Sequence, residues 1–111
     1  MKNGLFLDDE RVPSQVKWVE LPKDVNWTIV RNFDEFVDAV QHNSFDVISF
    51  DHDLGDAKTK TGQDCVKWLV NYMFDLKLEL IPKCYFHTKN PVGLGNMSVY
   101  WKNAVKEFLS Y

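Results

Sequence analysis

Short, mostly apolar runs alternate with longer periodic stretches along the chain. The runs do not alternate cleanly between apolar and polar residues, which is typical of strands that a parallel sheet buries on both faces. They lie at 5–7, 27–30, 47–50 and 84–86. In the longer stretches apolar residues recur every three or four positions, which predicts helices. These stretches lie at 33–40, 65–76 and 97–108. The alternation predicts an α/β domain with a mostly parallel sheet and covering helices.

Polar residues mark the starts of two of these helices. Asn32 is followed three positions later by Glu35, and Thr61 is followed at the same spacing by Asp64. This spacing resembles a capping box, in which each side chain bonds the backbone of the other. By contrast, residues 11–26 carry two prolines and little helical period, so we expect an irregular connection between the first two strands.

Composition limits the class of protein. The chain has 111 residues, of which 45% are hydrophobic and 14% aromatic, so a disordered chain is excluded and one domain spanning 1–111 is expected. The net charge of -3 provides no basic field for duplex nucleic acid. No apolar run is long enough for a membrane-spanning helix or for the hydrophobic region of a signal peptide. Cys65 and Cys84 lie in apolar patterns as reduced core thiols, which fits a cytoplasmic location.

Charged and polar residues follow each predicted strand. They are Asp8, Asp9 and Arg11 after the first strand, Arg31 after the second, Asp51, His52 and Asp53 after the third, and His87, Thr88 and Asn90 after the fourth. Ligands of open α/β sheets bind in the crevice outside the carboxyl ends of the strands. We therefore expect these side chains to converge there and to form the functional site.

The acids among them indicate a cation site. Asp8, Asp9 and Asp51 would repel one another if they lay within a few ångströms, unless a cation compensates their charge. Carboxylate oxygens are the ligands that Mg²⁺, Mn²⁺ and Ca²⁺ prefer. The alternative is that these acids are solvated loop residues that cap turns and helix starts.

The histidines and arginines indicate phosphate chemistry. His52 and His87 could share a wall of the crevice and act as general base and general acid, or they could ligate a transition metal. Each could also be a structural hydrogen-bonding residue. Arg31 could present a bidentate fork to a phosphate, or form a salt bridge with a nearby acid. Two glycine-containing loops, 55–62 and 90–96, lead into helices whose starts favour anions.

The acid pattern is similar to that of response-regulator receiver domains. Asp8 and Asp9 after the first strand, Asp51 after the third and Thr88 after the fourth carry the resemblance. It implies that the acid pair binds Mg²⁺, that Asp51 accepts a phosphoryl group and that Thr88 helps to signal its presence. Receivers have a fifth strand that ends in a Lys, and no candidate strand follows the last predicted helix here.

A second resemblance covers nearly the whole chain. The segments 5–13, 49–55, 61–64 and 87–97 resemble the cyclic-phosphate processing receiver-like family, a reduced relative of receivers found in bacteria and phages. The resemblance implies a flavodoxin-type three-layer fold with four parallel strands in the order 2-1-3-4 and no fifth strand. It also implies a metal-dependent phosphoesterase that acts on a cyclic phosphate of a nucleotide or an RNA end.

These inferences combine into one mechanism. We expect Asp8, Asp9 and Asp51 to hold one Mg²⁺ or Mn²⁺ ion that polarises a phosphoryl oxygen. One of His52 and His87 would activate water, and the other would protonate the departing ribose oxygen. Arg11 or Arg31 would neutralise the negative charge that builds on the phosphoryl oxygens. Asp53 and Asn90 would orient the histidines or the substrate, and Thr88 would bind the substrate.

Two other functions remain open from the sequence. The domain could be a non-catalytic binder that sequesters a cyclic nucleotide or a partner protein. It could also be a phosphorylatable signalling module that uses Asp51 as acceptor, although neither histidine has a role in that function.

Overall fold

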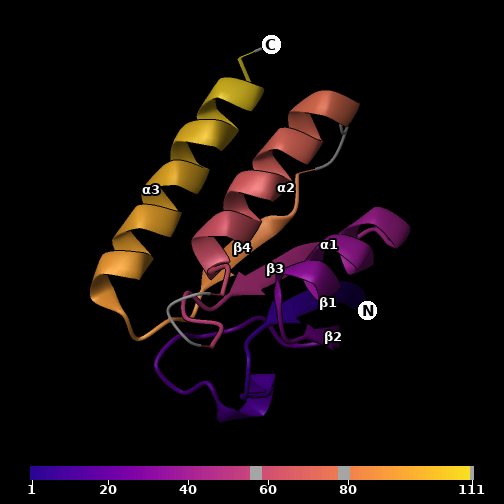
Figure 1. The fold of residues 1–111 in the computed structure, drawn as a ribbon. Helices are drawn as coiled ribbons and strands as arrows, with labels where there is room; N and C mark the ends of the chain where they lie inside the picture. The colour runs from indigo at the N-terminus through magenta and orange to yellow at the C-terminus, as the bar shows by residue number, and fades with distance from the viewer. Residues whose placement is uncertain (56–58, 78–80, 111) are drawn as a thin grey trace.

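The computed structural model describes residues 1–55, 59–77 and 81–110. Over these residues it contains four strands, three α-helices and one short 3-10 helix (Figure 1). The elements are β1 (Lys2–Leu7), η1 (Pro13–Gln15), β2 (Val25–Val30), α1 (Phe33–His42), β3 (Val47–Phe50), α2 (Gly62–Leu76), β4 (Lys83–Phe86) and α3 (Pro91–Phe108). The predicted strands and their order along the chain are confirmed.

The described strands form one parallel sheet in the order β2-β1-β3-β4, as predicted. The central strand β1 pairs with β2 on one side and with β3 on the other, so Leu5 lies beside Ile48 and Leu7 beside Phe50. These four side chains belong to the hydrophobic core, together with the inner faces of α1, α2 and α3. The helices therefore cover the same face of the sheet (Figure 1).

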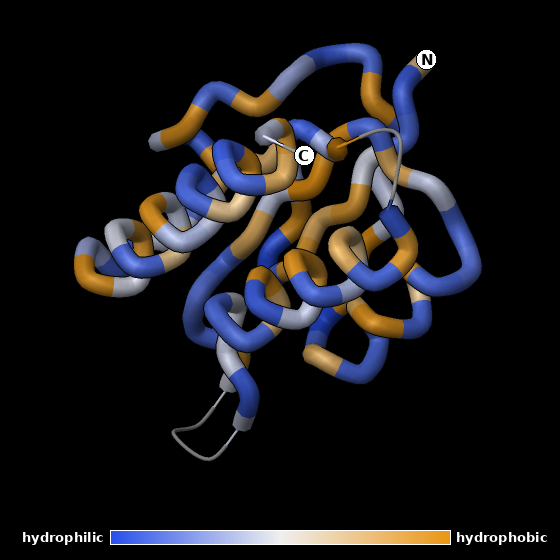
Figure 2. The backbone as a smooth tube through the Cα atoms, turned by 90° about the horizontal axis from the view of Figure 1, so that it is seen from above, coloured by the Kyte–Doolittle hydropathy of each residue, from blue (hydrophilic) through white to orange (hydrophobic). Residues whose placement is uncertain are grey.

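Figure 2 shows the physical origin of this arrangement: hydrophobic and hydrophilic positions alternate along the helices. Each helix therefore turns one apolar stripe toward the sheet and leaves its other side polar. Among the described helices none has the length and apolar character that crossing a bilayer requires.

The connection between β1 and β2 covers the other face of the sheet. This third layer carries only the short helix η1, which agrees with the irregular connection that the prolines predict. Phe6 and Ser49 are side by side in the register and are both fully buried on this face. Val16 of the connection is buried as well, so this segment shields the centre of the sheet.

Both expected helix caps are present. The cap at Thr61 is complete, and the cap at Asn32 differs in one hydrogen bond. Thr61 and Asp64 form a complete capping box, since each side chain bonds the backbone N–H of the other. The Asn32 side chain accepts the N–H of Glu35 as expected. The Glu35 carboxylate, however, accepts from the N–H of Arg31 rather than from that of Asn32.

The last helix begins earlier than the sequence predicts. The apolar stripe placed its start near residue 97, whereas α3 begins at Pro91, and residues 90–96 are its cap and first turns rather than a loop. Asn90 is the cap, because its side-chain oxygen accepts from the N–H groups of Val92 and Gly93. Proline suits the first helical position, where its missing N–H has no role. Of the other predicted loop, residues 56–58 lie outside the described part of the chain.

Candidate functional site

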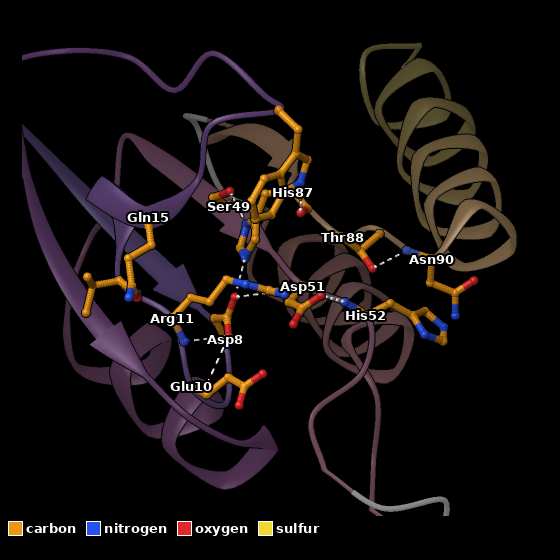
Figure 3. Close-up of polar contacts among 12 residues, drawn as sticks. Asp8, Glu10, Arg11, Gln15, Ser49, Asp51, His52, His87, Thr88 and Asn90 are labelled. Carbon is orange, nitrogen blue, oxygen red and sulfur yellow. Dashed lines mark hydrogen bonds and ion pairs between the residues drawn. The ribbon is translucent and has the colours of Figure 1, made fainter.

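Asp8 is the most tightly held acid at the carboxyl ends of the strands. Its side chain is fully buried directly after β1. One carboxylate oxygen accepts from the backbone N–H groups of Glu10 and Arg11 at 2.9 Å, and the other lies 3.0 Å from Nε2 of His87 (Figure 3). Burial alone raises the pKa of Asp8, but these hydrogen bonds outweigh it and lower the pKa to about 2. Asp8 is therefore an anion at neutral pH.

Asp51 has the opposite electrostatic environment. It follows β3 and is only 5% exposed. Burial and the negative charge of Asp8 raise its pKa, and the N–H of His52, 2.8 Å from the carboxylate, opposes them only in part. The two neighbouring buried carboxylates thus destabilise each other when both are ionised, and a bound cation would relieve this repulsion.

His87 completes a buried group with these two acids. Its ring stacks on Phe6 with the ring centroids 4.5 Å apart, and its Nδ1 lies 2.6 Å from the hydroxyl of Ser49 (Figure 3). Asp8, Asp51 and His87 each offer one ligand atom, and these atoms lie within 4.8 Å of one another. Two carboxylates and one imidazole are a donor set that fits Mn²⁺ and other divalent transition metals.

Asp9 lies outside this buried group. Its side chain is exposed, and partial burial together with the charge of Asp8 raises its pKa. Within the described ranges, the residues that could share an ion are Asp8, Asp51 and His87. The difference from the expected set of Asp8, Asp9 and Asp51 arises because successive residues at a strand end point in opposite directions.

Contrary to the expectation from the sequence, His52 and His87 do not face each other across one crevice. His87 is fully buried on the face of the sheet that the β1–β2 connection covers. His52 lies on the other side of Asp51 and points toward Asn90 (Figure 3). The reason is again the alternation of side chains, since Ser49 and Asp51 share one direction and His52 takes the other. The expectation of a solvent-facing site is wrong for His87.

His52 instead belongs to a second polar group with Asp53 and Asn90. Its Nδ1 lies 2.9 Å from a carboxylate oxygen of Asp53, and the amide of Asn90 donates to the other oxygen at 3.5 Å. The His52 ring packs directly against Gly93 in the first turn of α3, where a Cβ atom would collide with Cγ of the ring. A glycine at position 93 is therefore required for this placement. The expectation that Asp53 and Asn90 lie close to a histidine agrees with this geometry.

The arginines differ in their surroundings. Arg11 lies with Nη1 3.8 Å from Asp8, and its side chain is 31% exposed. Arg31 uses Nη1 to donate to the backbone carbonyls of Asp8 at 3.1 Å and Arg11 at 2.7 Å. Arg31 therefore supports the loop that carries Asp8, an arrangement that matches neither the phosphate fork nor the salt bridge considered from sequence.

Thr88 joins the buried and the exposed groups. It is buried beside Asp51, whose pKa its side-chain hydrogen bond lowers, and its hydroxyl accepts the N–H of Asn90 at 3.1 Å. Sequence reasoning missed Ser49 and Trp18, which contact His87 through Nδ1 and the backbone carbonyl respectively. Ser49 could have been found as the polar residue inside an otherwise apolar strand. Trp18 lies in the segment where no periodic pattern was present.

Comparison with known proteins identifies the family of the chain. A search of curated proteins finds no match to the chain. The family model of the cyclic-phosphate processing receiver domain matches residues 3–103, a range that includes nearly all of the sheet, the buried acids and both histidines. The chain therefore belongs to the cyclic-phosphate processing receiver domain family.

Proposed function

We propose that this domain is a divalent-metal-dependent phosphoesterase that opens a cyclic phosphate on a nucleotide or an RNA end. The observation that carries the proposal is the buried group of Asp8, Asp51 and His87 at the carboxyl ends of the strands. Membership of a family tied to cyclic-phosphate processing supports the choice of substrate. Asp8 and Asp51 would hold the ion, with His87 as the nitrogen ligand, and the bound ion would polarise a phosphoryl oxygen.

His87 has two compatible states in this proposal. The Ser49 hydroxyl can either donate to Nδ1 or accept from it, because a hydroxyl group is both donor and acceptor. When Nδ1 carries the proton, Nε2 has a lone pair for an ion; when Nε2 carries it, the ring donates to Asp8. Ser49 therefore supports both the metal-free and the metal-bound state of the imidazole.

His52 is the group that we assign to proton transfer. Asp53 holds its Nδ1, and in the described part of the chain Nε2 has no hydrogen-bond partner. Nε2 would take a proton from the attacking water as the new oxygen–phosphorus bond forms. The same imidazole would return that proton to the ribose oxygen as its bond to phosphorus breaks. This assigns to one histidine the two steps that the sequence analysis divided between two.

Arg11 is a cation that could bind the phosphate. Its guanidinium lies beside Asp8 and is partly exposed, so it can reach a ligand without leaving the site. A guanidinium group can stabilise the negative charge that builds on the phosphoryl oxygens. Thr88 accepts the N–H of Asn90, and the Asn90 amide donates to Asp53 beside His52, so these two residues would orient the ester.

Turnover assays test the proposal directly. The purified domain would be incubated with 2′,3′-cyclic nucleotides, short RNAs ending in a cyclic phosphate and cyclic dinucleotides, with Mg²⁺, Mn²⁺ or a chelator. We expect a phosphate monoester product with metal, none with chelator, and none from Asp51→Asn. Asp38→Asn is the matched control, because Asp38 is an exposed helix residue that pairs with His42 away from the strand ends. Binding of these compounds without turnover would favour the alternative of a sequestering protein.

A further inference from the structure

Trp18 is fixed beside the site although it comes from the irregular β1–β2 connection. Its indole Nε1 donates to the backbone carbonyl of His87 at 2.6 Å, a contact between residues 69 positions apart in the chain. Because His87 follows β4 directly, this bond holds the indole at the carboxyl ends of the strands.

Two cations lie against the Trp18 ring. Nζ of Lys89 is 4.2 Å from the ring centroid, and Cζ of Arg11 is 5.1 Å from it. The same Arg11 guanidinium contacts Asp8 at 3.8 Å, so a single side chain joins the indole to the buried acid group. With both cations in place, Trp18 is still 37% exposed.

This arrangement leaves the Trp18 indole accessible to a ligand and does not bury it in the core. An indole that only filled space would be covered, as Trp101 in the core is. Here the hydrogen bond fixes the orientation of the ring, while more than a third of its surface remains accessible. Aromatic rings held in this way bind nucleobases by stacking, which tolerates any base because each has a π face.

We propose that Trp18 is the stacking surface for a nucleobase, and that the substrate is a cyclic phosphate that carries a base, as opposed to a base-free sugar or glycerol cyclic phosphate. The inference rests on the proposed function, since it assigns the substrate class of the same site. The two cations have a role in it. An incoming phosphate attracts Arg11 and Lys89, whose contacts with the ring are weak at an exposed position, and the ring becomes more available to the base.

A pair of substrates that differ only in the base tests the inference. These are 2′,3′-cyclic AMP and the 2,3-cyclic phosphate of methyl riboside. We expect kcat/KM of the wild type to be about 10-fold or more higher for the base-bearing compound. Trp18→Leu should remove this preference by raising KM for cyclic AMP alone, and Trp18→Phe should keep most of it. Trp68→Phe, which alters a tryptophan of α2 packed against Phe36 and Tyr72, should leave the preference unchanged.

The variants also separate stacking from structural support. Phenylalanine keeps a ring but lacks the Nε1 donor that bonds His87. If Trp18→Phe and Trp18→Leu lose activity equally on both compounds, the indole only supports the end of β4 and the inference is wrong. Equal kcat/KM of the wild type for the two compounds overturns it without any variant.

Failure of the proposed function has a different signature. If neither compound is hydrolysed, calorimetric titration of both compounds in Mn²⁺ still measures the contribution of the base to affinity. A preference for cyclic AMP that Trp18→Leu removes would support the stacking surface in a binding protein. Equal affinities, or no binding of either compound, would overturn it.

Discussion

Nε2 of His87 lies 3.0 Å from a carboxylate oxygen of Asp8, and both side chains are fully buried. This contact joins the ends of β1 and β4, which are not neighbours in the sheet. It places an imidazole beside two carboxylates whose negative charges repel each other, and it makes His87 part of the interior. His52, with its own carboxylate partner, is the more exposed histidine.

The first prediction concerns His87 and stability. His87→Ala should lower the free energy of unfolding by roughly 3 kcal/mol, because it leaves a cavity and removes partners of Asp8 and Ser49 in the interior. Chemical denaturation of the metal-free protein measures this. His42→Ala is the matched control, since His42 is exposed and should change stability by less than about 0.5 kcal/mol. An equally small effect of His87→Ala would show that the buried group contributes nothing to folding.

His52 should behave differently from His87. We expect His52→Ala to reduce turnover of a cyclic phosphate by roughly 10²-fold, with a stability loss of only about 1 kcal/mol. Asp53→Asn should give a smaller loss of turnover, since it retains a side chain of the same shape next to Nδ1. Steady-state kinetics together with thermal melting distinguish the two effects. Full activity of a folded His52→Ala variant would exclude His52 from the chemistry.

Asp51 should oppose folding in the absence of metal. Its pKa is raised by burial and by Asp8, so the ionised form is less favourable in the folded state than in the unfolded chain. Metal-free Asp51→Asn should therefore melt no lower than the wild type at neutral pH. Mn²⁺ should raise the melting temperature of the wild type, because the ion binds the native state, and should have little effect on the variant. An equal Mn²⁺ response of both proteins would contradict the proposed ion site.

Asp8 sets the acid limit of stability. Its pKa is about 2 in the folded state against an ordinary value of 3.8, so the folded state favours the ionised form. The stability that ionised Asp8 contributes is fully present above pH 3.8 and is lost as the pH falls through about 2. Between about pH 6 and pH 3 the wild type should lose about 1 kcal/mol from this group, and Asp8→Asn should lack that part of the pH dependence. Denaturation of metal-free protein at both pH values measures the difference, and identical pH dependence of the two proteins would contradict it.

Stable phosphorylation of Asp51 is not expected. In the part of the chain that the structure describes, β4 is the edge of the sheet, and no fifth strand delivers a lysine to hold an acyl phosphate. Acetyl phosphate or beryllofluoride should therefore leave the protein unmodified, as intact-mass spectrometry and chemical shifts would show. Stoichiometric modification of Asp51 would support the signalling alternative.

The fold could be predicted from the sequence because its signals are local. Buried strands, helical stripes and the Thr61–Asp64 capping box each depend on residues close in the chain, and the parallel order followed from a family resemblance. The start of α3 was missed because Asn90 and Pro91 form a strong start signal that precedes the apolar stripe by several residues. The glycines within that turn favour a loop when only the sequence is considered, whereas in the structure the contact with His52 requires Gly93.

The location of the polar side chains that follow the strands was predictable, and their relative orientation was not. The residues that follow the strands do gather at the carboxyl ends, as the topology requires. Which of them share a direction depends on the alternation of side chains at each strand end. Asp9 is therefore exposed and lies outside the group that Asp8, Asp51 and His87 form, and His52 points away from that group. The position of Trp18 could not be predicted from the sequence, because it depends on one hydrogen bond to a carbonyl that is distant in the chain.

The most direct test of the central claim is hydrolysis of a 2′,3′-cyclic nucleotide in heavy-oxygen water, followed by mass spectrometry. We expect a phosphate monoester that carries one heavy oxygen, formed with Mn²⁺ by the wild type and absent with chelator or with Asp51→Asn. Recovery of unchanged substrate from folded, Mn²⁺-loaded protein, across the whole panel of cyclic phosphates, would contradict it.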